Sequence, residues 1–170
     1  DIGEGFPVVL IHGFPEDGSI FSAQENYLQN KFRLIIRDLP GGGNSPLVPN
    51  LTIELMADFI HAVFEAEKID QCVMIGHSMG GYITLALAEK NPGLLKGFGF
   101  FNSTALPDSE EKKQARLRSV EFMQKHSAAF FVRHMMPGLF SVDFKSRYPE
   151  KVKALIKHSE HFKTEALVAY

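Results

Sequence analysis

Apolar residues along this chain follow two spacings that belong to different secondary structures. Short continuous apolar runs are typical of strands that are buried on both faces of a parallel sheet. Between these runs, apolar residues recur every three or four positions, as they do on one face of a helix. The strand-like runs are residues 7–11, 32–36, 72–75 and 96–101. Strands that alternate with helices in this way predict an α/β fold with a parallel sheet and helical crossovers.

Two helices are predicted between these strands. Apolar residues repeat at helical spacing from Leu55 to Phe64, and Thr52 stands where an N-cap is expected. The second helix is predicted from about Gly80 to Lys90, where an Asn-Pro-Gly sequence ends it. Both helices therefore connect consecutive strands of the predicted sheet.

The character of the chain changes after Leu106. Charged and apolar residues then interleave at helical spacing, without a further strand-like run. The predicted helical segments are residues 109–126, 128–136 and 152–161. We predict that residues 1–106 form the sheet core and that residues 107–170 form a helical insertion on it, rather than an independent domain.

The amino-acid composition excludes only a few classes of fold and function. The 170 residues, 45% of them hydrophobic, are enough to bury one ordinary core. A formal net charge of −2 gives no reason to expect nucleic acid as a partner. The apolar runs are too short to span a membrane, and no signal peptide is visible, so we expect a cytoplasmic location. The single cysteine, Cys72, excludes an internal disulfide and is interpreted as a small buried hydrophobe.

The sequence GHSMGG, residues 76–81, lies between the third predicted strand and the second predicted helix. This is the context of a nucleophile elbow, in which a serine sits on a sharp, strained turn with its hydroxyl exposed. Gly76 and Gly80 leave the space that such a turn requires, and the hydroxyl of Ser78 would stand over a helix N-terminus, where negative charge is favoured. The alternative is a glycine-rich turn that binds phosphate or only packs closely. The glycine spacings of dinucleotide-binding loops and P-loops are both absent.

A second candidate loop, His12-Gly13-Phe14-Pro15, follows the first predicted strand. Open parallel sheets bind ligands at this end of their strands. Gly13 would let the backbone approach a reacting group, so that the N–H groups of Phe14 and Met79 could together stabilise an oxyanion. His12 either holds this loop by hydrogen bonds or takes part in proton transfer.

A third loop, DLPGGGNS, follows the second predicted strand and is interpreted as a scaffold turn in which Asp38 accepts backbone N–H bonds. In this order, HGFP, DLPGGGNS and GHSMGG resemble the α/β-hydrolase superfamily, in its esterase, C–C hydrolase and haloperoxidase-like branch. The resemblance covers residues 5–101 and, less specifically, the helical cap of that branch. It implies a three-layer parallel-sheet α/β-hydrolase core, in which the predicted strands correspond to the third through sixth of eight.

The resemblance also implies the residues of the site. Ser78 would be the nucleophile, and the backbone amides of Phe14 and Met79 would form the oxyanion hole. The elbow and loop would be supported by His12, Gly13, Gly76, His77 and Gly80. His77 adjoins the nucleophile, but neighbours at a sharp turn normally point apart, which argues against its acting as the base.

The triad acid and histidine of the family follow the nucleophile in the chain, and no residue after 101 matches either of them. We therefore expect that the chain is part of a polypeptide of roughly 250 residues or more, and that it is close to inactive by itself. The late histidines fall in predicted cap helices: His126, His134, His158 and His161. His158 and His161 are three residues apart and could share a metal ion, but the sequence offers no third ligand beside them, so we assign no metal and no cofactor.

Two functional hypotheses follow. The first is a serine hydrolase that cleaves a small or medium ester, thioester or lactone through an acyl-enzyme at Ser78. The second is a binding or receptor-like protein that uses the same pocket without turnover. Apolar cap residues would either roof a substrate pocket or pack the cap. These residues are Phe122, Phe130, Phe131, Met135, Met136 and Phe140. Both hypotheses predict a small-molecule partner.

Overall fold

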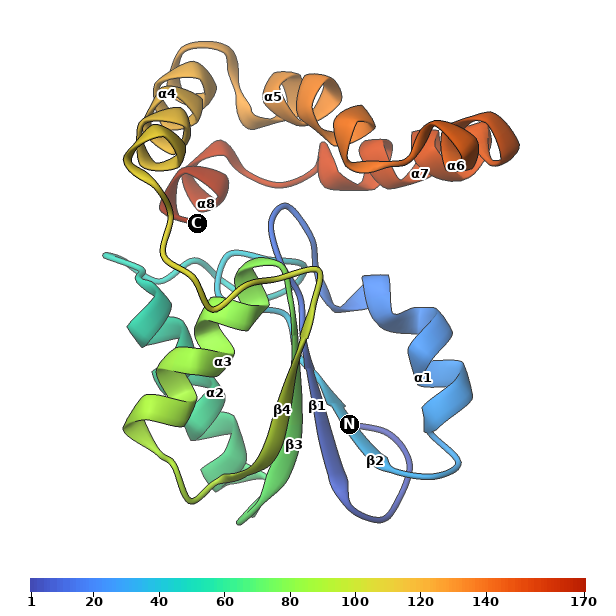
Figure 1. The fold of residues 1–170 in the computed structure, drawn as a ribbon, viewed down its shortest axis with the longest axis vertical. Coiled ribbons are helices and arrows are strands. Elements are labelled where there is room, and N and C mark those ends of the chain that lie inside the picture. Colours follow the sequence, from blue (N-terminus) through green and yellow to red (C-terminus); the bar gives the residue numbers. More distant parts are fainter. The chain divides into compact units, whose positions relative to one another are not determined.

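A computed structural model describes all 170 residues, which form two compact units, Asp1–Leu106 and Pro107–Tyr170. We call them the sheet unit and the helical unit. The boundary between them falls where the sequence loses its strand-like runs. Figure 1 shows the sheet unit as three layers, with helices on both faces of a central sheet.

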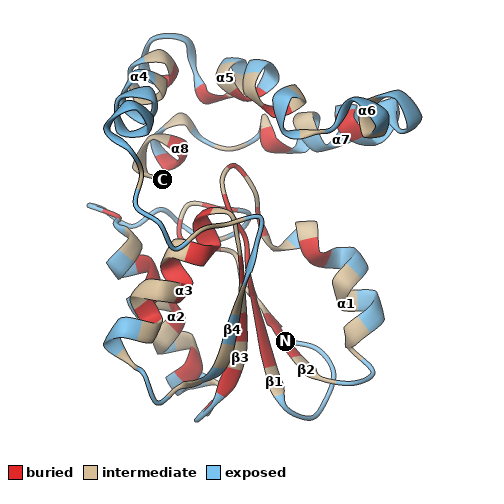
Figure 2. Cartoon of the chain, viewed as in Figure 1, coloured by how far each residue is buried: buried red, intermediate tan, exposed pale blue.

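The sheet has four parallel strands in the order β2-β1-β3-β4. Their bounds are β1 (Pro7–Ile11), β2 (Arg33–Ile36), β3 (Cys72–His77) and β4 (Leu95–Phe101). All four predicted strands are confirmed. β3 continues two residues beyond its apolar run, because its pairing with β4 extends to His77 opposite Phe101. The central strand β1 is buried, as its continuous apolar run predicts, and Figure 2 shows this buried centre.

Helices cover the two faces of this sheet. Their bounds are η1 (Gly18–Phe21), α1 (Ser22–Leu28), α2 (Ile53–Ala66) and α3 (Met79–Lys90). α1 lies on one face, and α2 and α3 lie on the other (Figure 1). Thr52 caps α2 as predicted, because its Oγ accepts the Leu55 N–H at 3.2 Å. Met56, Ile60 and Phe64 form the buried face of α2, so the helical spacing of apolar residues predicted this element correctly.

The helix α1 has no counterpart among the predicted elements. None of its seven residues is buried, so its sequence carries no apolar face that would reveal it. It follows η1, whose Phe21 is only 1% exposed and packs in the core with Val8 and Leu34. A single buried aromatic residue before the helix thus attaches this segment to the sheet.

The glycine-rich loop after β2 is organised by Asp38. Its Oδ2 accepts the Asn44 N–H at 2.9 Å within the loop, and its Oδ1 accepts the Gly18 N–H at 3.0 Å from the segment after β1. Gly41 and Gly43 have φ values of +92° and +49°, which side chains disfavour. The loop is therefore a scaffold turn, as predicted, and it also ties two loops together.

Two further features of the sheet unit bear on the sequence predictions. Cys72 is fully buried in β3, and burial raises the pKa of its thiol to about 11, so the interpretation as a buried hydrophobe is confirmed. β4 is an edge strand of the four-stranded sheet and exposes Phe98, Phe100 and Phe101 by 36–49%. The sheet therefore exposes aromatic side chains along this edge strand.

The helical unit contains α4 (Glu110–His126), α5 (Ala128–Met135), η2 (Met136–Leu139), α6 (Val142–Arg147), α7 (Pro149–Ser159) and α8 (Thr164–Ala169). The three predicted helical segments are present with shifted ends, whereas the six-residue helices α6 and α8 had no predicted counterpart. The apolar residues of the helical unit differ in how far they are buried. Met136 is 5% exposed, whereas Phe130 is 41% exposed and its ring contacts that of His134 in a tilted arrangement, with 4.3 Å between centroids.

Candidate active site

Ser78 joins β3 to α3 in a strained conformation. Its φ of +51° and ψ of −118° lie in a region that residues with a side chain rarely adopt. Hydrogen bonds hold it there: its N–H donates to Phe101 O at 3.0 Å, and its carbonyl accepts the Gly81 N–H at 3.0 Å and the Ser103 hydroxyl at 2.7 Å. Strain of this kind persists only where the surroundings over-determine it, and Ser78 meets that condition.

The glycines on either side of the elbow occupy positions where no side chain fits. A Cβ at Gly76 would collide with the carbonyl group of Gly80. A Cβ at Gly80 would collide with the carbonyl of Ile11 and would lie 2.8 Å from the carbonyl oxygen of His12. The turn therefore packs against itself and against the end of β1, which is the physical reason for both glycines.

The HGFP loop lies directly against the elbow. β1 and β3 are neighbours in the sheet, with Ile11 opposite Gly76. A Cβ at Gly13 would lie 2.8 Å from Ser78 Cβ and 2.9 Å from His77 O. The tertiary structure thus brings together two motifs that are more than sixty residues apart in the chain.

His12 is fully buried and holds two loops together. Its Nε2 accepts the Leu39 N–H at 2.9 Å, so Nδ1 carries the ring proton and donates it to Gly13 O at 3.0 Å. Burial lowers the pKa of His12, because the charged ring would lose its hydration. With both ring nitrogens engaged with backbone groups, this histidine has the contacts of a loop support.

The burial of His12 predicts a pH dependence of stability. Because the pKa in the folded protein lies below the reference value of 6.5, the unfolded chain takes up this proton first as the pH falls. The contribution is complete above about pH 6.5 and declines below it, by at most about 1.4 kcal/mol per pH unit. Urea unfolding of wild type and His12→Gln at neutral and mildly acidic pH measures it. The variant should lose less stability on acidification, and an equal loss in both proteins would contradict the prediction.

Glu16, which the sequence analysis did not single out, lies beside this loop. Its Oε2 is 2.7 Å from His77 Nδ1 and accepts the Gly13 N–H at 3.1 Å. Ser103, which holds the carbonyl of Ser78, was also missed. The local sequence marks neither residue, since each contact joins segments that are distant in the chain. The sequence offers two weak signals for these residues. Glu16 is an acidic residue shortly after HGFP, and Ser103 is a serine just after the fourth strand.

A family model described as the alpha/beta hydrolase fold matches residues 7–139, which is most of the chain. The chain belongs to the α/β-hydrolase family.

Known relatives of this α/β-hydrolase include several hydrolases. It is 28% identical over 165 residues to the putative carbamate hydrolase RutD of Serratia proteamaculans, covering 95% of this chain and 61% of that protein. It is 37% identical over 91 residues to a pimeloyl-acyl-carrier-protein methyl ester esterase of Methylococcus capsulatus, covering 54% of this chain and 34% of that protein. A thermophilic esterase from Thermogutta terrifontis has a similar structure, with a TM-score of 0.92 and 33% identity, covering 99% of this chain and 62% of that one. The chain therefore spans about three fifths or less of the length of these relatives.

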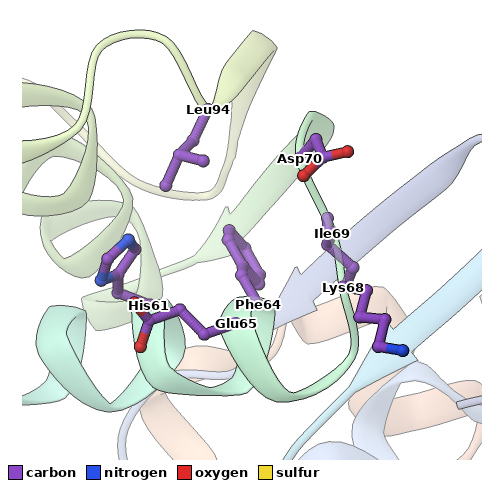
Figure 3. Close-up of a pocket in the computed structure, with 7 residues that line it drawn as sticks. All are labelled: His61, Phe64, Glu65, Lys68, Ile69, Asp70 and Leu94. Carbon is purple, nitrogen blue, oxygen red and sulfur yellow. The ribbon is translucent and has the colours of Figure 1, made fainter.

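The histidines of this α/β-hydrolase are distributed over both units. In the sheet unit, His12 and His77 have the partners described above. His61 lies on α2 in a surface hollow at the opposite end of the sheet, where β3 and β4 begin (Figure 3). The hollow is lined by His61, Phe64, Glu65, Lys68, Ile69, Asp70 and Leu94. The hollow is therefore separate from the elbow.

Two further observations concern ligands and membranes. No group of three or more histidine, cysteine or acidic side chains is arranged to hold a metal ion. None of the helices combines the length and the apolar character that a membrane crossing needs.

In the helical unit, Asp108 forms an ion pair with Arg116, and Asp143 forms one with Arg147.

Proposed function

We propose that the complete polypeptide carrying this sequence is a serine hydrolase that forms an acyl-enzyme at Ser78. The observation that carries the proposal is the contact between the two motifs, in which Gly13 lies against the Cβ of a strained Ser78. A backbone loop this close to a nucleophile can supply the N–H groups that acyl transfer needs.

In this proposal Ser78 Oγ attacks the carbonyl carbon of the substrate, and its proton passes to a general base. The carbonyl electron pair moves to oxygen, and the oxyanion accepts hydrogen bonds from the N–H groups of Phe14 and Met79. The position of Met79 supports this role, since it is the first residue of α3 and the first N–H groups of a helix have no partner within it. Collapse of the intermediate expels the alcohol or thiol, and water then releases the acid and restores Ser78.

The general base comes from outside the sheet unit in this proposal. His12 is held between backbone groups, His77 is bound to Glu16, and His61 lies at the other end of the sheet. Since no histidine after residue 101 matches the family's base, the proton acceptor in this proposal belongs to segments of the longer polypeptide.

The proposed substrates are small or medium esters, thioesters or lactones. This class is supported by the esterases among the relatives. No cofactor enters the proposed chemistry.

Labelling with a fluorophosphonate tests the proposal. The complete polypeptide should take up one equivalent of the probe, and mass spectrometry should locate it on the peptide that contains Ser78. Such probes react only with a serine whose hydroxyl is activated by a base. Binding of an ester without labelling would favour the receptor-like alternative, and labelling at another serine would contradict the assignment of the nucleophile.

A further inference from the structure

A carboxylate–imidazole pair lies beside the elbow. Glu16 comes from the loop after β1 and His77 is the last residue of β3. Glu16 Oε2 and His77 Nδ1 are 2.7 Å apart, and the two side chains are only 17% and 19% exposed. Fully exposed polar contacts contribute little because water competes with them, whereas this one is largely shielded from solvent.

The same oxygen makes a second hydrogen bond. Glu16 Oε2 also accepts the Gly13 N–H at 3.1 Å, so one atom joins the HGFP loop to the residue before the nucleophile. His77 is itself held from the other side, because its ring contacts that of Phe101 with 5.3 Å between centroids. The connection therefore runs from β4 through β3 to the loop.

Both close packing and a hydrogen bond hold the HGFP loop in place. The absence of a side chain at Gly13 lets the loop touch Ser78 Cβ and His77 O, and the bond to Glu16 keeps it in that place. We infer that Glu16 and His77 are positioning residues that hold the backbone of Gly13 and Phe14 at the oxyanion site. The catalytic part of this inference rests on the proposed serine hydrolase function.

The hydrogen bond between Glu16 and His77 also reduces an unfavourable electrostatic interaction at the oxyanion site. An isolated carboxylate beside an oxyanion site would repel the negative charge that develops there. Here the carboxylate oxygen is occupied by an imidazole N–H and a backbone N–H, so part of its charge is compensated. Loss of His77 alone would leave the carboxylate with only the Gly13 N–H as a partner, which predicts that removal of both side chains lowers kcat no more than removal of His77 alone.

Four variants of the complete polypeptide test the inference, with p-nitrophenyl acetate as the substrate. Glu16→Ala and His77→Ala should lower kcat about ten- to hundredfold with little change in KM, because a displaced oxyanion donor acts on the transition state. Glu16→Gln keeps an oxygen that can accept both bonds. His77→Asn keeps an N–H close to the position of Nδ1. Both conservative variants should therefore retain kcat within about threefold.

Glu67→Ala is the matched control. Glu67 is also a partly buried carboxylate, paired with Arg33 and Arg37 at 2.8 and 2.6 Å, but it follows α2 and contacts neither the loop nor the elbow. Its kcat should match that of the wild type. A Glu16→Ala variant with wild-type kcat would overturn the inference. So would a His77→Asn variant as impaired as His77→Ala, since an asparagine keeps the donor but cannot accept a proton as a base.

Hydrogen exchange at the Gly13 amide provides a readout that does not depend on turnover. Exchange should accelerate in Glu16→Ala and stay near the wild-type rate in Glu16→Gln and Glu67→Ala. Unchanged exchange in Glu16→Ala would refute the anchoring itself. A wild-type protein without hydrolysis or labelling would refute the proposed function, while the exchange rates would still decide whether Glu16 holds the loop.

Discussion

Replacing Ser78 by alanine is expected to lower ester turnover by at least about 10⁴-fold in the complete polypeptide, because the acyl-enzyme can no longer form. Alanine carries the same backbone and Cβ as serine, so the elbow and its bonds to Phe101, Gly81 and Ser103 should remain. Substrate binding should therefore persist while kcat is lost. Steady-state kinetics with a chromogenic ester, together with ligand binding by calorimetry, measure the two effects separately.

The control for this variant is Ser119→Ala. Ser119 lies on α4 in the helical unit, where its hydroxyl donates to the carbonyl of Ala115 at 3.0 Å. Its loss should leave turnover unchanged. Activity of Ser78→Ala within tenfold of the wild type would contradict the assignment of the nucleophile, because the residual rate from positioning and oxyanion contacts is far smaller than the full rate.

Replacing Gly76 by alanine is expected to reduce the free energy of unfolding by about 3 kcal/mol or more. The added methyl group would collide with three backbone atoms, in Gly80 and Gly81, and backbone atoms cannot move aside as the end of a side chain can. The elbow would have to open, so hydrolysis should be lost with stability. Urea unfolding followed by circular dichroism gives the change in free energy, and fluorophosphonate labelling reports the state of the elbow.

Gly93→Ala is the matched glycine substitution. A Cβ at Gly93 meets no atom within 4 Å, so the change should alter stability by less than about 1 kcal/mol, and in the stabilising direction if only the entropy of the unfolded chain decides. Similar losses in the Gly76 and Gly93 variants would show that crowding at the elbow is not the cause.

Much of the sheet unit could be predicted because its signals are local. The apolar run of β1 and the capped amphipathic pattern of α2 each lie within one short segment, and burial of that segment is decided by its own residues. The same is true of part of the elbow, where Gly76 is crowded by Gly80 and Gly81, its near neighbours in the chain, whereas the atoms that crowd Gly80 belong to the distant residues Ile11 and His12. By contrast, α1 has no buried residue and depends on Phe21 before it, so its own sequence contained no apolar pattern to detect.

By itself, the sequence determined the α/β class, the four strands, the turn at Asp38 and the position of a strained serine between a strand and a helix. Only the tertiary structure decided which distant groups meet there. The order β2-β1-β3-β4 places β1 beside β3, so that Gly13 touches Ser78 and Glu16 reaches His77 across a separation of 61 residues. Local spacing cannot encode such contacts, because they depend on which strands become neighbours when the sheet forms.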